Sequence, residues 1–458
     1  MRHHDLVVIG TGSGNSFVDR RFEHLDVAMV EHGTFGGTCL NVGCIPTKMY
    51  VHPADVAQHV RHASRFGVDA HLDRVRWSDL RDRIFGRIDP ISAGGRQYRL
   101  HRSPNVTLYE GHARFTGPRQ LEVERTDGAG PDAFTADRVV IAAGTRPVVP
   151  DAVAGSGVPF HTSDTVMRLD AAPQHLVIIG AGYIAAEFAH VFSALGSEVS
   201  VVARSDLMLR SQDETIAQRY TALAAERWDL RLQTTLAGVR GQPGDVAVDL
   251  VGGGTVRGDV LLVATGRTPN SDLLDLEKAG IPTHDDGRVV VDEHQRSPAD
   301  GVFALGDVSS PYQLKHVANH EAKVVAHNLL DPDHPRRTDH RFVPSAVFTD
   351  PQIASVGRTE ADCRDDGLDY AVKVQAYGDI AYGWALEDTT GFCKLLAERG
   401  SGRLLGAHLM GPGAATVIQP LIQAMSFGLT AREMATGQYW IHPALPEVVE
   451  NALLGLDV

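Results

Sequence analysis

The sequence of 458 residues has only four cysteines, and this scarcity excludes a secreted scaffold built on disulfide bonds. It also lacks the run of about 18 apolar residues that a membrane-spanning helix needs. The most apolar stretch, residues 176–186, ends at Glu187. We therefore expect a soluble protein. Because no signal peptide precedes the first strand-like run at residues 6–9, we expect a cytoplasmic location.

Positive charge is scarce as well, since 43 Lys and Arg residues face 57 Asp and Glu residues, which gives a formal net charge of -14. Such a surface disfavours general binding of nucleic acid, which needs many basic contacts to the phosphates. We expect no nucleic-acid partner and no membrane partner. The hydrophobic fraction of 43% allows a large core, and a domain size of about 150 residues predicts about three domains.

Two segments have the pattern of a strand, a glycine turn and a helix. Residues 6–9 precede Gly10-Thr11-Gly12-Ser13-Gly14, and residues 176–179 precede Gly180-Ala181-Gly182. Backbone N–H groups at such a turn can hold a pyrophosphate. Each unit is followed by an apolar run and a second glycine turn, at 143–147 and at 264–269. The sequence therefore predicts an α/β protein with two Rossmann-like dinucleotide-binding domains.

Asn15 departs from the fingerprint of the first unit. Gly or Ala usually stands at this position, where the helix packs closely on the strand. Because Asn is bulkier, we expect the first helix to lie farther from its strand.

The two units differ where their next strand ends. Strand 27–30 ends at Glu31, where a carboxylate can bind the two ribose hydroxyls of an adenosine. Strand 198–203 ends at Arg204, and Arg210 follows six residues later. Guanidinium groups there can pair with a 2'-phosphate, which favours NADPH over NADH. The alternative is two solvated arginines in an Arg-rich chain.

The densest chemical signal lies in residues 36–48, where Cys39 and Cys44 are five positions apart. A helix that begins near Cys44, with Pro46 in its first turn, places Lys48 on the same face. The helix dipole and the ammonium group both stabilise a thiolate at Cys44. The pair is therefore predicted to be a redox disulfide. A zinc site would need about four ligands, and a structural disulfide that closes so short a loop stabilises little.

The segment Gly-Gly-Thr-Cys-Leu-Asn-Val-Gly-Cys-Ile-Pro-Thr-Lys at 36–48, after a nucleotide fingerprint, resembles the pyridine nucleotide-disulfide oxidoreductases. This is the family of glutathione reductase and dihydrolipoamide dehydrogenase, and the resemblance covers essentially the whole chain. It implies FAD in the first unit, NADPH or NADH in the second, and a homodimer formed by a C-terminal α+β domain. It also implies that Cys44 is the thiol next to the flavin and that Cys39 attacks the substrate.

The same resemblance assigns roles to further residues. It implies that Lys48 pairs with Glu187 beside the flavin, that Asp307 binds the ribityl chain, and that Tyr183 gates the nicotinamide. It implies that His442 and Glu447 form an acid/base pair, which acts on the disulfide of the partner subunit. A departing thiolate needs a proton near pH 7, and an imidazole with a carboxylate behind it supplies one. The predicted residues for the two dinucleotides are Gly10, Gly12, Gly14, Glu31, Gly37, Thr38, Lys48, Gly144, Gly180, Gly182, Tyr183, Arg204, Arg210, Gly266 and Asp307.

Changes in composition predict where the domains meet. Residues 148–158, rich in small residues and proline, are typical of a connection, and the polar run 331–337 is typical of a loop. Beyond that loop the pattern changes to alternating strands at 371–375, 392–397 and 404–410 and to C-terminal helices. The predicted units are an FAD domain (1–149), an NADPH domain (150–266), a central part that completes the FAD domain (267–339) and an α+β interface domain (340–458).

The substrate is inferred from what the family branches carry. Residues 451–458 lack the C-terminal cysteine pair of mercuric reductases, and Arg204 stands where dihydrolipoamide dehydrogenases usually have an acid. The reaction that these comparisons leave is the reduction of a low-molecular-weight disulfide by NADPH. The blocks 10–16, 33–37, 316–321 and 437–447 resemble an actinobacterial branch whose substrate is mycothione, the disulfide of mycothiol. Glutathione disulfide, lipoamide and a non-catalytic flavin-binding subunit of a multienzyme complex stay open as alternatives.

Overall fold

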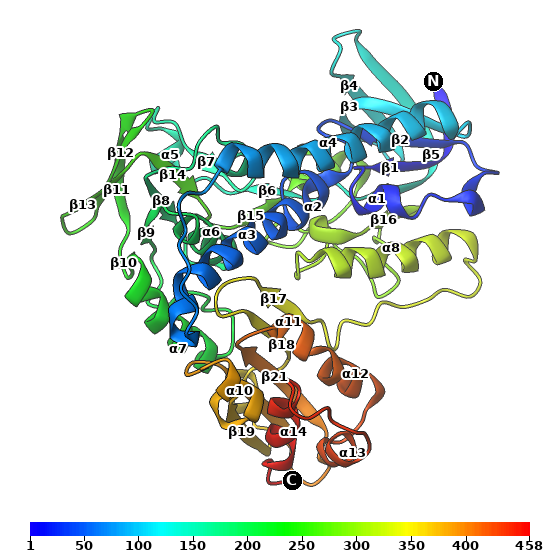
Figure 1. Ribbon diagram of the computed structural model, residues 1–458. Coiled ribbons are helices and arrows are strands. Elements are labelled where there is room, and N and C mark those ends of the chain that lie inside the picture. The colour runs from blue at the N-terminus through cyan, green and yellow to red at the C-terminus, as the bar shows by residue number, and fades with distance from the viewer.

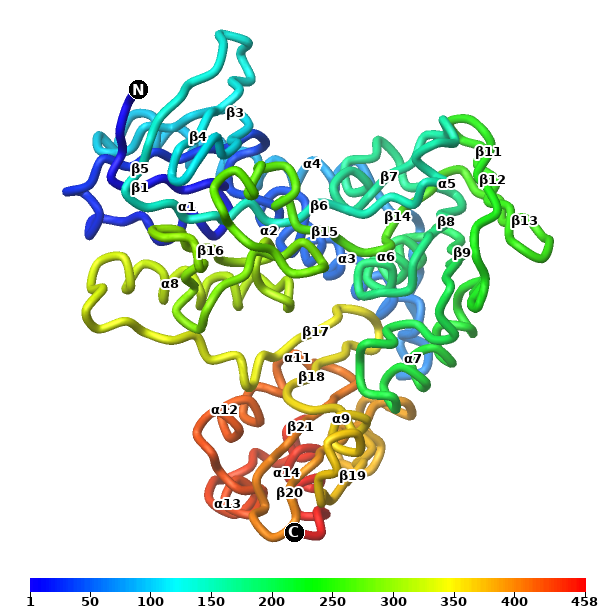
Figure 2. The backbone as a smooth tube through the Cα atoms, turned by 180° about the vertical axis from the view of Figure 1, so that it is seen from behind, coloured from blue at the N-terminus to red at the C-terminus, as the bar shows by residue number.

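Three large β-sheets organise the chain in the computed structural model, which describes residues 1–458. Figure 1 shows the N-terminal sheet at the upper right, the second sheet at the upper left and the C-terminal sheet at the bottom. Figure 2 shows the same arrangement from behind, with helices α3 (Cys44–His62) and α4 (Trp77–Arg102) between the first two sheets. No helix is both long enough and apolar enough to cross a bilayer.

The first sheet is mainly parallel around its first strand, which pairs with β2 on one side and β5 on the other. Val7 and Val8 are fully buried, because a strand covered on both faces needs a continuous apolar run. Helix α8 (Lys315–Leu330) packs Val325 and Ala326 into the cluster that contains Val8. The six strands are β1 (Arg2–Ile9), β2 (Val27–Glu31), β3 (Val106–Gly117), β4 (Gln120–Arg125), β5 (Pro131–Ile141) and β16 (Val302–Ala304).

The second sheet is wholly parallel, in the order β10-β9-β8-β14-β7. Helix α6 (Tyr183–Ala194) follows its glycine turn and is buried along most of its length, because it also packs against α3. Helix α7 (Glu214–Arg227) follows later in the same domain. The five strands are β7 (His161–Thr162), β8 (His175–Ile179), β9 (Glu198–Val202), β10 (Asp229–Arg231) and β14 (Val260–Val263).

Two smaller sheets complete the first two domains. A three-stranded antiparallel sheet packs its valines against Val177 and Val202 of the second sheet. A two-stranded sheet joins the two connections between the domains. Helix α5 (Asp151–Ala154) lies in the first connection. The strands are β11 (Leu236–Gln242), β12 (Asp245–Leu250) and β13 (Thr255–Gly258) in the larger one, and β6 (Thr145–Pro147) and β15 (Arg267–Pro269) in the smaller one.

The C-terminal sheet is antiparallel, in the order β17-β18-β21-β20-β19, and α14 packs Val448, Val449 and Ala452 against it. Its strands are β17 (Ser345–Val347), β18 (Ile353–Gly357), β19 (Tyr370–Ala376), β20 (Phe392–Glu398) and β21 (Leu404–Met410). Its helices are α9 (Glu360–Asp365), α10 (Ala381–Ala385), α11 (Ala414–Val417), α12 (Gln419–Phe427), α13 (Ala431–Thr436) and α14 (Glu447–Leu454).

The predicted fold class is confirmed, with two doubly wound nucleotide-binding units and a C-terminal α+β domain. The predicted strands at 371–375, 392–397 and 404–410 lie within β19, β20 and β21. The limits at 149/150, 266/267 and 339/340 fall outside all strands of the three large sheets, and we retain them as proposed limits.

The helix after the first glycine turn differs from the expectation. Helix α1 (Ser13–Ser16) has only one turn. At its end, Arg99 of α4 donates to the backbone and side-chain oxygens of Asn15, at 2.9 and 2.7 Å, and to Val18 O. The prediction that Asn15 moves this helix away from its strand is wrong. A Cβ atom at Gly14 would lie 2.8 Å from Val8 Cγ1, so the helix packs closely through the residue before Asn15.

Candidate active site

A cavity of about 1040 Å³ lies where the three domains meet. Most of the residues predicted for the flavin and for the redox reaction line it. The second nucleotide turn and the C-terminal acid/base pair lie outside it. The predicted residues in its wall are Gly10, Gly12, Glu31, Gly37, Thr38, Cys39, Cys44, Lys48, Gly144, Tyr183, Glu187 and Asp307. The predicted residues elsewhere are Gly14, Gly180, Gly182, Arg204, Arg210, Gly266, His442 and Glu447.

The first glycine turn is a tight backbone cradle. Gly10 has φ +101°, and a Cβ atom there would lie 2.4 Å from the carbonyl oxygen of Ala142. Glu31, at the end of β2, accepts hydrogen bonds from Thr11 N–H at 2.9 Å and from the Thr11 hydroxyl at 2.6 Å. The carboxylate therefore fixes the turn and still faces the cavity. Such a turn can hold the pyrophosphate of a dinucleotide through its N–H groups.

The redox segment lies directly on this cradle. Helix α2 (Gly37–Asn41) carries Cys39, and helix α3 begins at Cys44. A Cβ atom at Gly37 would lie only 2.6 Å from Gly12 Cα, so the two backbones are in direct contact. Gly36 N–H also donates to the Thr11 hydroxyl at 3.0 Å. The two cysteines are thereby placed next to the first glycine turn.

The two thiols are free in the structure, and they differ in acidity. The hydrogen bond from Cys39 lowers the pKa of Cys44 to about 7; burial opposes this shift, and the nearby Lys48 ammonium supports it. The same hydrogen bond, together with burial, raises the pKa of Cys39. In the reduced pair the negative charge therefore rests on Cys44. Cys39 needs a base before it can attack another sulfur.

An ion pair fixes an ammonium group beside the thiols. Lys48 Nζ lies 2.7 Å from both carboxylate oxygens of Glu187, whose side chain is only 6% exposed. Phe348 N–H donates to the same carboxylate at 3.0 Å, and the Lys48 ammonium lies 4.6 Å from the centre of the Phe348 ring. The cation is thus held in one position by groups from all three domains.

Asp307 offers acceptor capacity to a polar ligand. It follows β16 and accepts a hydrogen bond from the Thr145 hydroxyl at 3.3 Å. Burial raises the pKa of Asp307, although Arg267 partly offsets the effect. No Lys, Arg or His nitrogen lies within 4.0 Å of this carboxylate. The remaining lone pairs fit a hydroxyl-rich group such as the ribityl chain of FAD.

The second glycine turn is separate from the thiols. A Cβ atom at Gly180 would lie 2.2 Å from Ala264 O, whereas one at Gly182 would have no heavy atom within 4 Å. Tyr183, the first residue of α6, is half exposed in the cavity wall. Arg204 and Arg210 are exposed and have no side-chain hydrogen bond or ion pair. Their guanidinium groups are free to bind an anion.

The C-terminal acid/base pair forms within one chain but does not reach the thiols of that chain. His442 Nδ1 lies 2.5 Å from Glu447 Oε1, and Ala444 N–H donates to the other carboxylate oxygen at 3.0 Å. Burial opposes ionisation of Glu447, yet these hydrogen bonds keep its pKa below the usual value. His442 is 70% exposed and does not line the cavity.

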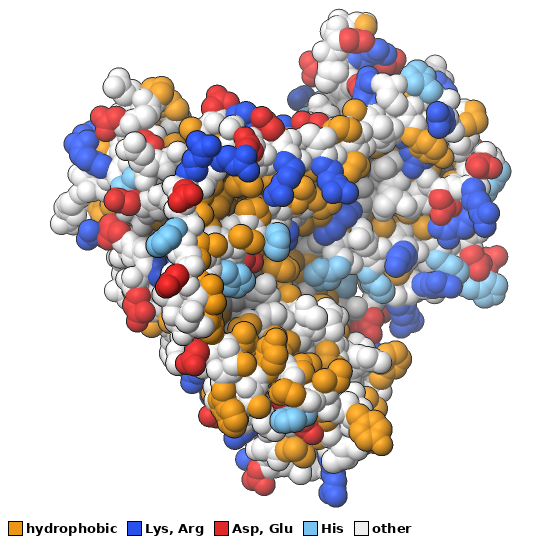
Figure 3. All heavy atoms as spheres, in the orientation of Figure 1, with side chains coloured by type: hydrophobic (Ala, Val, Ile, Leu, Met, Phe, Trp, Pro, Cys, Tyr) orange, Lys and Arg blue, Asp and Glu red, His pale blue; other side chains and the backbone are white.

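The C-terminal domain that carries this pair has several exposed apolar side chains. Tyr439 and Ile441 are largely exposed, as is Phe427 at the end of α12. Figure 3 shows hydrophobic side chains gathered on the lower part of the molecule, over the C-terminal domain. A surface of this kind is typical of a protein interface.

Lys315 is a site residue that the motifs did not identify. It begins α8, lines the cavity and donates from Nζ to the Ser13 hydroxyl at 2.8 Å. The contact spans 302 positions in sequence, so no local pattern predicts it. The available signal is compositional, because the chain has only six lysines and this one follows Asp307 by eight residues.

Family comparisons agree with this geometry. Residues 4–322 match the model of the pyridine nucleotide-disulphide oxidoreductases, and residues 343–453 match the dimerisation domain of that family. A mycothione reductase from Mycobacterium tuberculosis is 60% identical over 463 residues, which cover 100% of each chain. A mercuric reductase from Streptomyces lividans is 34% identical and covers 96% of this chain and 93% of its own.

Solved structures show the same architecture. The HOCl-induced flavoprotein disulfide reductase RclA from Escherichia coli superposes with a TM-score of 0.83 at 28% identity, over 98% of this chain and 99% of that one. The Cu(II) complex of the same protein gives a TM-score of 0.85 at 27% identity, over 99% of both chains. The similarity therefore extends over all three sheets.

Proposed function

Because this chain belongs to the pyridine nucleotide-disulphide oxidoreductase family, we propose that it uses NADPH to reduce mycothione to two molecules of mycothiol. It is a flavoprotein disulfide reductase. The observation that supports the chemistry best is the contact of the Cys39–Cys44 segment with the first glycine turn. The choice of substrate rests on the 60% identity with the mycobacterial mycothione reductase over the full length of both chains.

The residues of the first domain fit FAD. We assign the pyrophosphate to the turn at Gly10 and Gly12, the adenosine ribose to Glu31, and the ribityl chain to Asp307. Lys315 adds a positive charge at Ser13, where the one-turn helix α1 contributes little dipole. FAD supplies two-electron chemistry between a pyridine nucleotide and a disulfide. Gly14, Gly37, Thr38 and Gly144 complete the proposed flavin-binding set.

The thiols and the partner's base carry out the sulfur chemistry. The partner subunit's His442, held by Glu447, takes the proton of Cys39, whose raised pKa makes a base necessary. The Cys39 thiolate attacks one sulfur of mycothione and forms a mixed disulfide, and the imidazolium protonates the mycothiol thiolate that leaves. The Cys44 thiolate then attacks the Cys39 sulfur, closes the Cys39–Cys44 disulfide and expels the second mycothiol as a thiolate, which takes its proton from water. Lys48, fixed by Glu187, stabilises that thiolate.

The second domain fits a dinucleotide with a 2'-phosphate. We assign the pyrophosphate to the turn at Gly180 and Gly182, with Gly266 on the neighbouring turn and Tyr183 at the nicotinamide. Arg204 and Arg210 are exposed and unpaired, and they would bind the 2'-phosphate. The favoured cofactor is therefore NADPH.

The position of the base outside the cavity supports a homodimer. His442 lies on the C-terminal domain outside the cavity that contains Cys39, so a second copy of the chain must supply it. The exposed apolar side chains of the C-terminal domain provide a surface for that copy. We place the enzyme in the cytoplasm, where thiols are kept reduced.

An assay with a panel of disulfides tests this proposal. We would follow NADPH oxidation with mycothione, glutathione disulfide and lipoamide as substrates. Mycothione is expected to have the highest kcat/KM, and the variant Cys39→Ser should lose disulfide reduction while it still reduces quinones. Preferred turnover of glutathione disulfide or lipoamide would contradict the substrate assignment, and disulfide turnover by Cys39→Ser would contradict the mechanism.

A further inference from the structure

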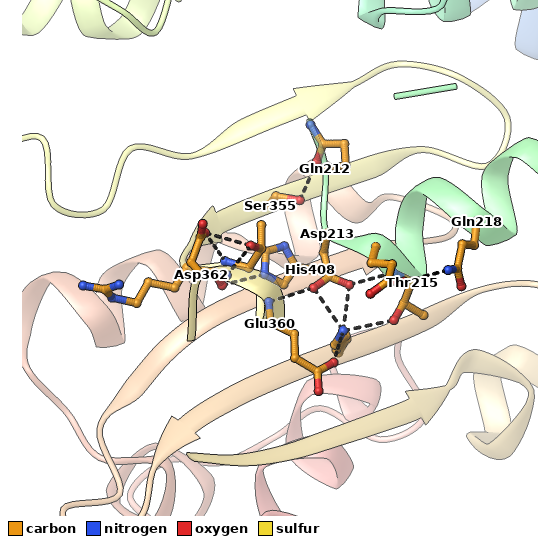
Figure 4. A network of polar contacts seen from close by, with 12 residues as sticks. Gln212, Asp213, Thr215, Gln218, Ser355, Glu360, Asp362 and His408 are labelled. Atoms are coloured by element: carbon orange, nitrogen blue, oxygen red, sulfur yellow. Dashed lines mark hydrogen bonds and ion pairs between the residues drawn. The ribbon is translucent and has the colours of Figure 1, made fainter. Parts of the chain in front are cut away.

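A buried polar network joins the pyridine nucleotide domain to the interface domain. Gln212, Asp213 and His408 of this network also line the central cavity, but none of them has a role in the proposed reaction. Figure 4 shows Asp213 between His408 and Thr215, with Glu360 below it. Asp213 stands just before α7, whereas Glu360 begins α9 and His408 lies in β21. The network therefore connects two domains that come from different parts of the chain.

An ion pair without solvent access lies at its centre. Lys394 Nζ, from β20, lies 2.8 and 3.0 Å from the two carboxylate oxygens of Asp213. The two side chains are 1% and 0% exposed. Lys394 also lies 2.7 Å from Glu360 Oε2 and donates to the Thr215 hydroxyl at 3.0 Å. A buried charge pair with further hydrogen bonds tolerates little displacement, because separation would leave charges unpaired away from water.

Asp213 also ends the loop that carries the two free arginines. Residues 203–212 connect β9 to α7, and Asp213 is the N-cap of α7, where it accepts from Thr215 N–H at 3.0 Å. Glu360 N–H of the interface domain donates to the same carboxylate at 3.1 Å. The position of this loop end is thus set by groups of the interface domain.

The loop has further attachments to both domains. Leu209 N–H donates to Ala181 O of the second glycine turn at 2.8 Å. Gln212 Oε1 accepts from the Ser355 hydroxyl of β18 at 2.8 Å, and Figure 4 shows these two side chains facing each other.

Earlier in the loop, Ser205 O accepts from Gln233 N–H at 2.9 Å, and Met208 N–H donates to the Thr221 hydroxyl at 3.0 Å, both within the nucleotide domain. The interface domain therefore holds only the end of the loop, at Gln212 and Asp213. Arg204 and Arg210 have no attachment of their own.

We propose that Asp213 and Lys394 are positioning residues that hold the end of the loop 203–212, so that Arg210 joins Arg204 at the 2'-phosphate of NADPH. The interface domain then contributes to the discrimination between NADPH and NADH, although it does not touch the nucleotide. This inference rests on the proposed use of NADPH. The physical reason is preorganisation: a loop that is already fixed loses less conformational entropy when its guanidinium groups pair with a phosphate.

The test measures nucleotide selectivity in the flavin-loaded enzyme. The variants are Asp213→Asn and Lys394→Met, which break the ion pair, and Ser355→Ala, which removes the milder attachment at Gln212. Titrations give the Kd of each variant for NADPH and for NADH. We expect Asp213→Asn and Lys394→Met to weaken NADPH binding about five- to tenfold, and Ser355→Ala to weaken it about two- to threefold. NADH binding should change much less, because NADH has no 2'-phosphate.

The exposed ion pair between Arg364 and Glu214 provides a matched control. It joins α9 to α7, as the buried network does, with a distance of 3.2 Å, but both side chains are about half exposed and neither holds the loop. Arg364→Gln should leave both dissociation constants unchanged, because exposed pairs contribute little. If the role of the network is purely structural, the ion-pair variants will have lower thermal stability, but the ratio of their Kd values for NADPH and NADH will equal that of the wild type.

The outcomes separate this inference from the proposed cofactor. The double variant Arg204→Gln, Arg210→Gln should lose NADPH selectivity directly. If it keeps selectivity, the arginines do not recognise the 2'-phosphate, and the positioning role fails with them. If the wild type itself does not prefer NADPH, the cofactor assignment fails. If the double variant loses selectivity while Asp213→Asn, Lys394→Met and Ser355→Ala all keep it, only the positioning role is refuted. If the ion-pair variants do not fold, the ratio of the Kd values for NADPH and NADH in Ser355→Ala decides whether the positioning role holds.

Discussion

The two glycine turns have the same spacing of glycines but differ in the helix that follows them and in what packs against them. The first turn leads into the four-residue helix α1 and has the redox segment packed on it, with Gly37 against Gly12. The second turn leads into the twelve-residue helix α6, and open space surrounds Gly182. This difference fits the proposal that the first turn is part of the reaction centre and that the second binds a nucleotide that dissociates in each cycle.

This difference also determines where positive charge comes from. A twelve-residue helix presents a full macrodipole at its N-terminus, but a single turn presents little. At the first turn the Lys315 ammonium, 2.8 Å from the Ser13 hydroxyl, supplies the positive charge that a longer helix dipole would provide. At the second turn the additional charge lies farther out, on Arg204 and Arg210. One fingerprint thus supports two kinds of dinucleotide site.

The largest effect is expected from a substitution that breaks the contact between the first turn and the redox segment. In Gly37→Ala the added Cβ would lie 2.6 Å from Gly12 Cα, at a position with φ +72°. Strain of this kind costs about 3 kcal/mol, so FAD affinity should fall more than about a hundredfold. The measurement is the ratio of flavin to protein after purification. Gly182→Ala is the matched change at the second turn and should keep its flavin; equal flavin contents in the two variants would contradict the comparison.

The second expected effect concerns the charge at the second turn. In the double variant Arg204→Gln, Arg210→Gln, two charge-assisted contacts to the 2'-phosphate are lost. Each is worth about 1.5–3 kcal/mol, so the KM for NADPH should rise at least about a hundredfold. The KM for NADH should stay the same. Steady-state kinetics with both nucleotides checks this, and a parallel rise of both KM values would exclude 2'-phosphate recognition by these arginines.

A smaller effect is expected from the charge at the first turn. Lys315→Met removes the ammonium beside Ser13 and should weaken FAD binding about tenfold, or about 1.4 kcal/mol. Reconstitution of flavin-free protein, followed by flavin fluorescence, gives the Kd. Lys323→Met, on the exposed side of the same helix α8, is the control. If both variants bind FAD as tightly as the wild type, Lys315 does not compensate for the short helix.

The smallest effect is a shift in the titration of Cys44. With a pKa of about 7, its alkylation by iodoacetamide in reduced, flavin-free protein should speed up as the pH rises through about 7. Lys48→Gln should move this midpoint upward, because the ammonium favours the thiolate. Glu187→Gln should move it downward, because the carboxylate opposes the thiolate. Peptide mapping identifies the alkylated cysteine, and shifts of the opposite sign would contradict the electrostatic roles of the pair.

Local patterns predicted the elements that local forces form. The runs 6–9 and 176–179 are strands because a buried parallel strand is apolar throughout, and α3 begins at Cys44 as its residues indicated. The length of α1 could not be predicted in this way. The oxygens at its end accept from Arg99, which lies 84 positions away from Asn15.

The contacts of the candidate site also divide into local ones, which the sequence could suggest, and long-range ones, which it could not. The pairing of His442 with Glu447 spans five positions, so spacing alone could suggest it. The contact of Lys48 with Glu187 spans 139 positions and was expected only from the family resemblance. The contacts of Lys315 with Ser13 and of Lys394 with Asp213 span 302 and 181 positions, and no motif indicated them. Contacts between domains depend on the packing of whole sheets, which one sequence does not reveal.

A thiol count after anaerobic reduction tests the electron path most directly. Oxidised, FAD-loaded enzyme would receive one equivalent of NADPH, and its accessible thiols would then be titrated under denaturing conditions. Storage of the electron pair on Cys39 and Cys44 predicts about two new thiols per FAD in the wild type and none in Cys39→Ser. A wild-type enzyme that consumes NADPH without gaining thiols would show that the electrons do not reach this pair.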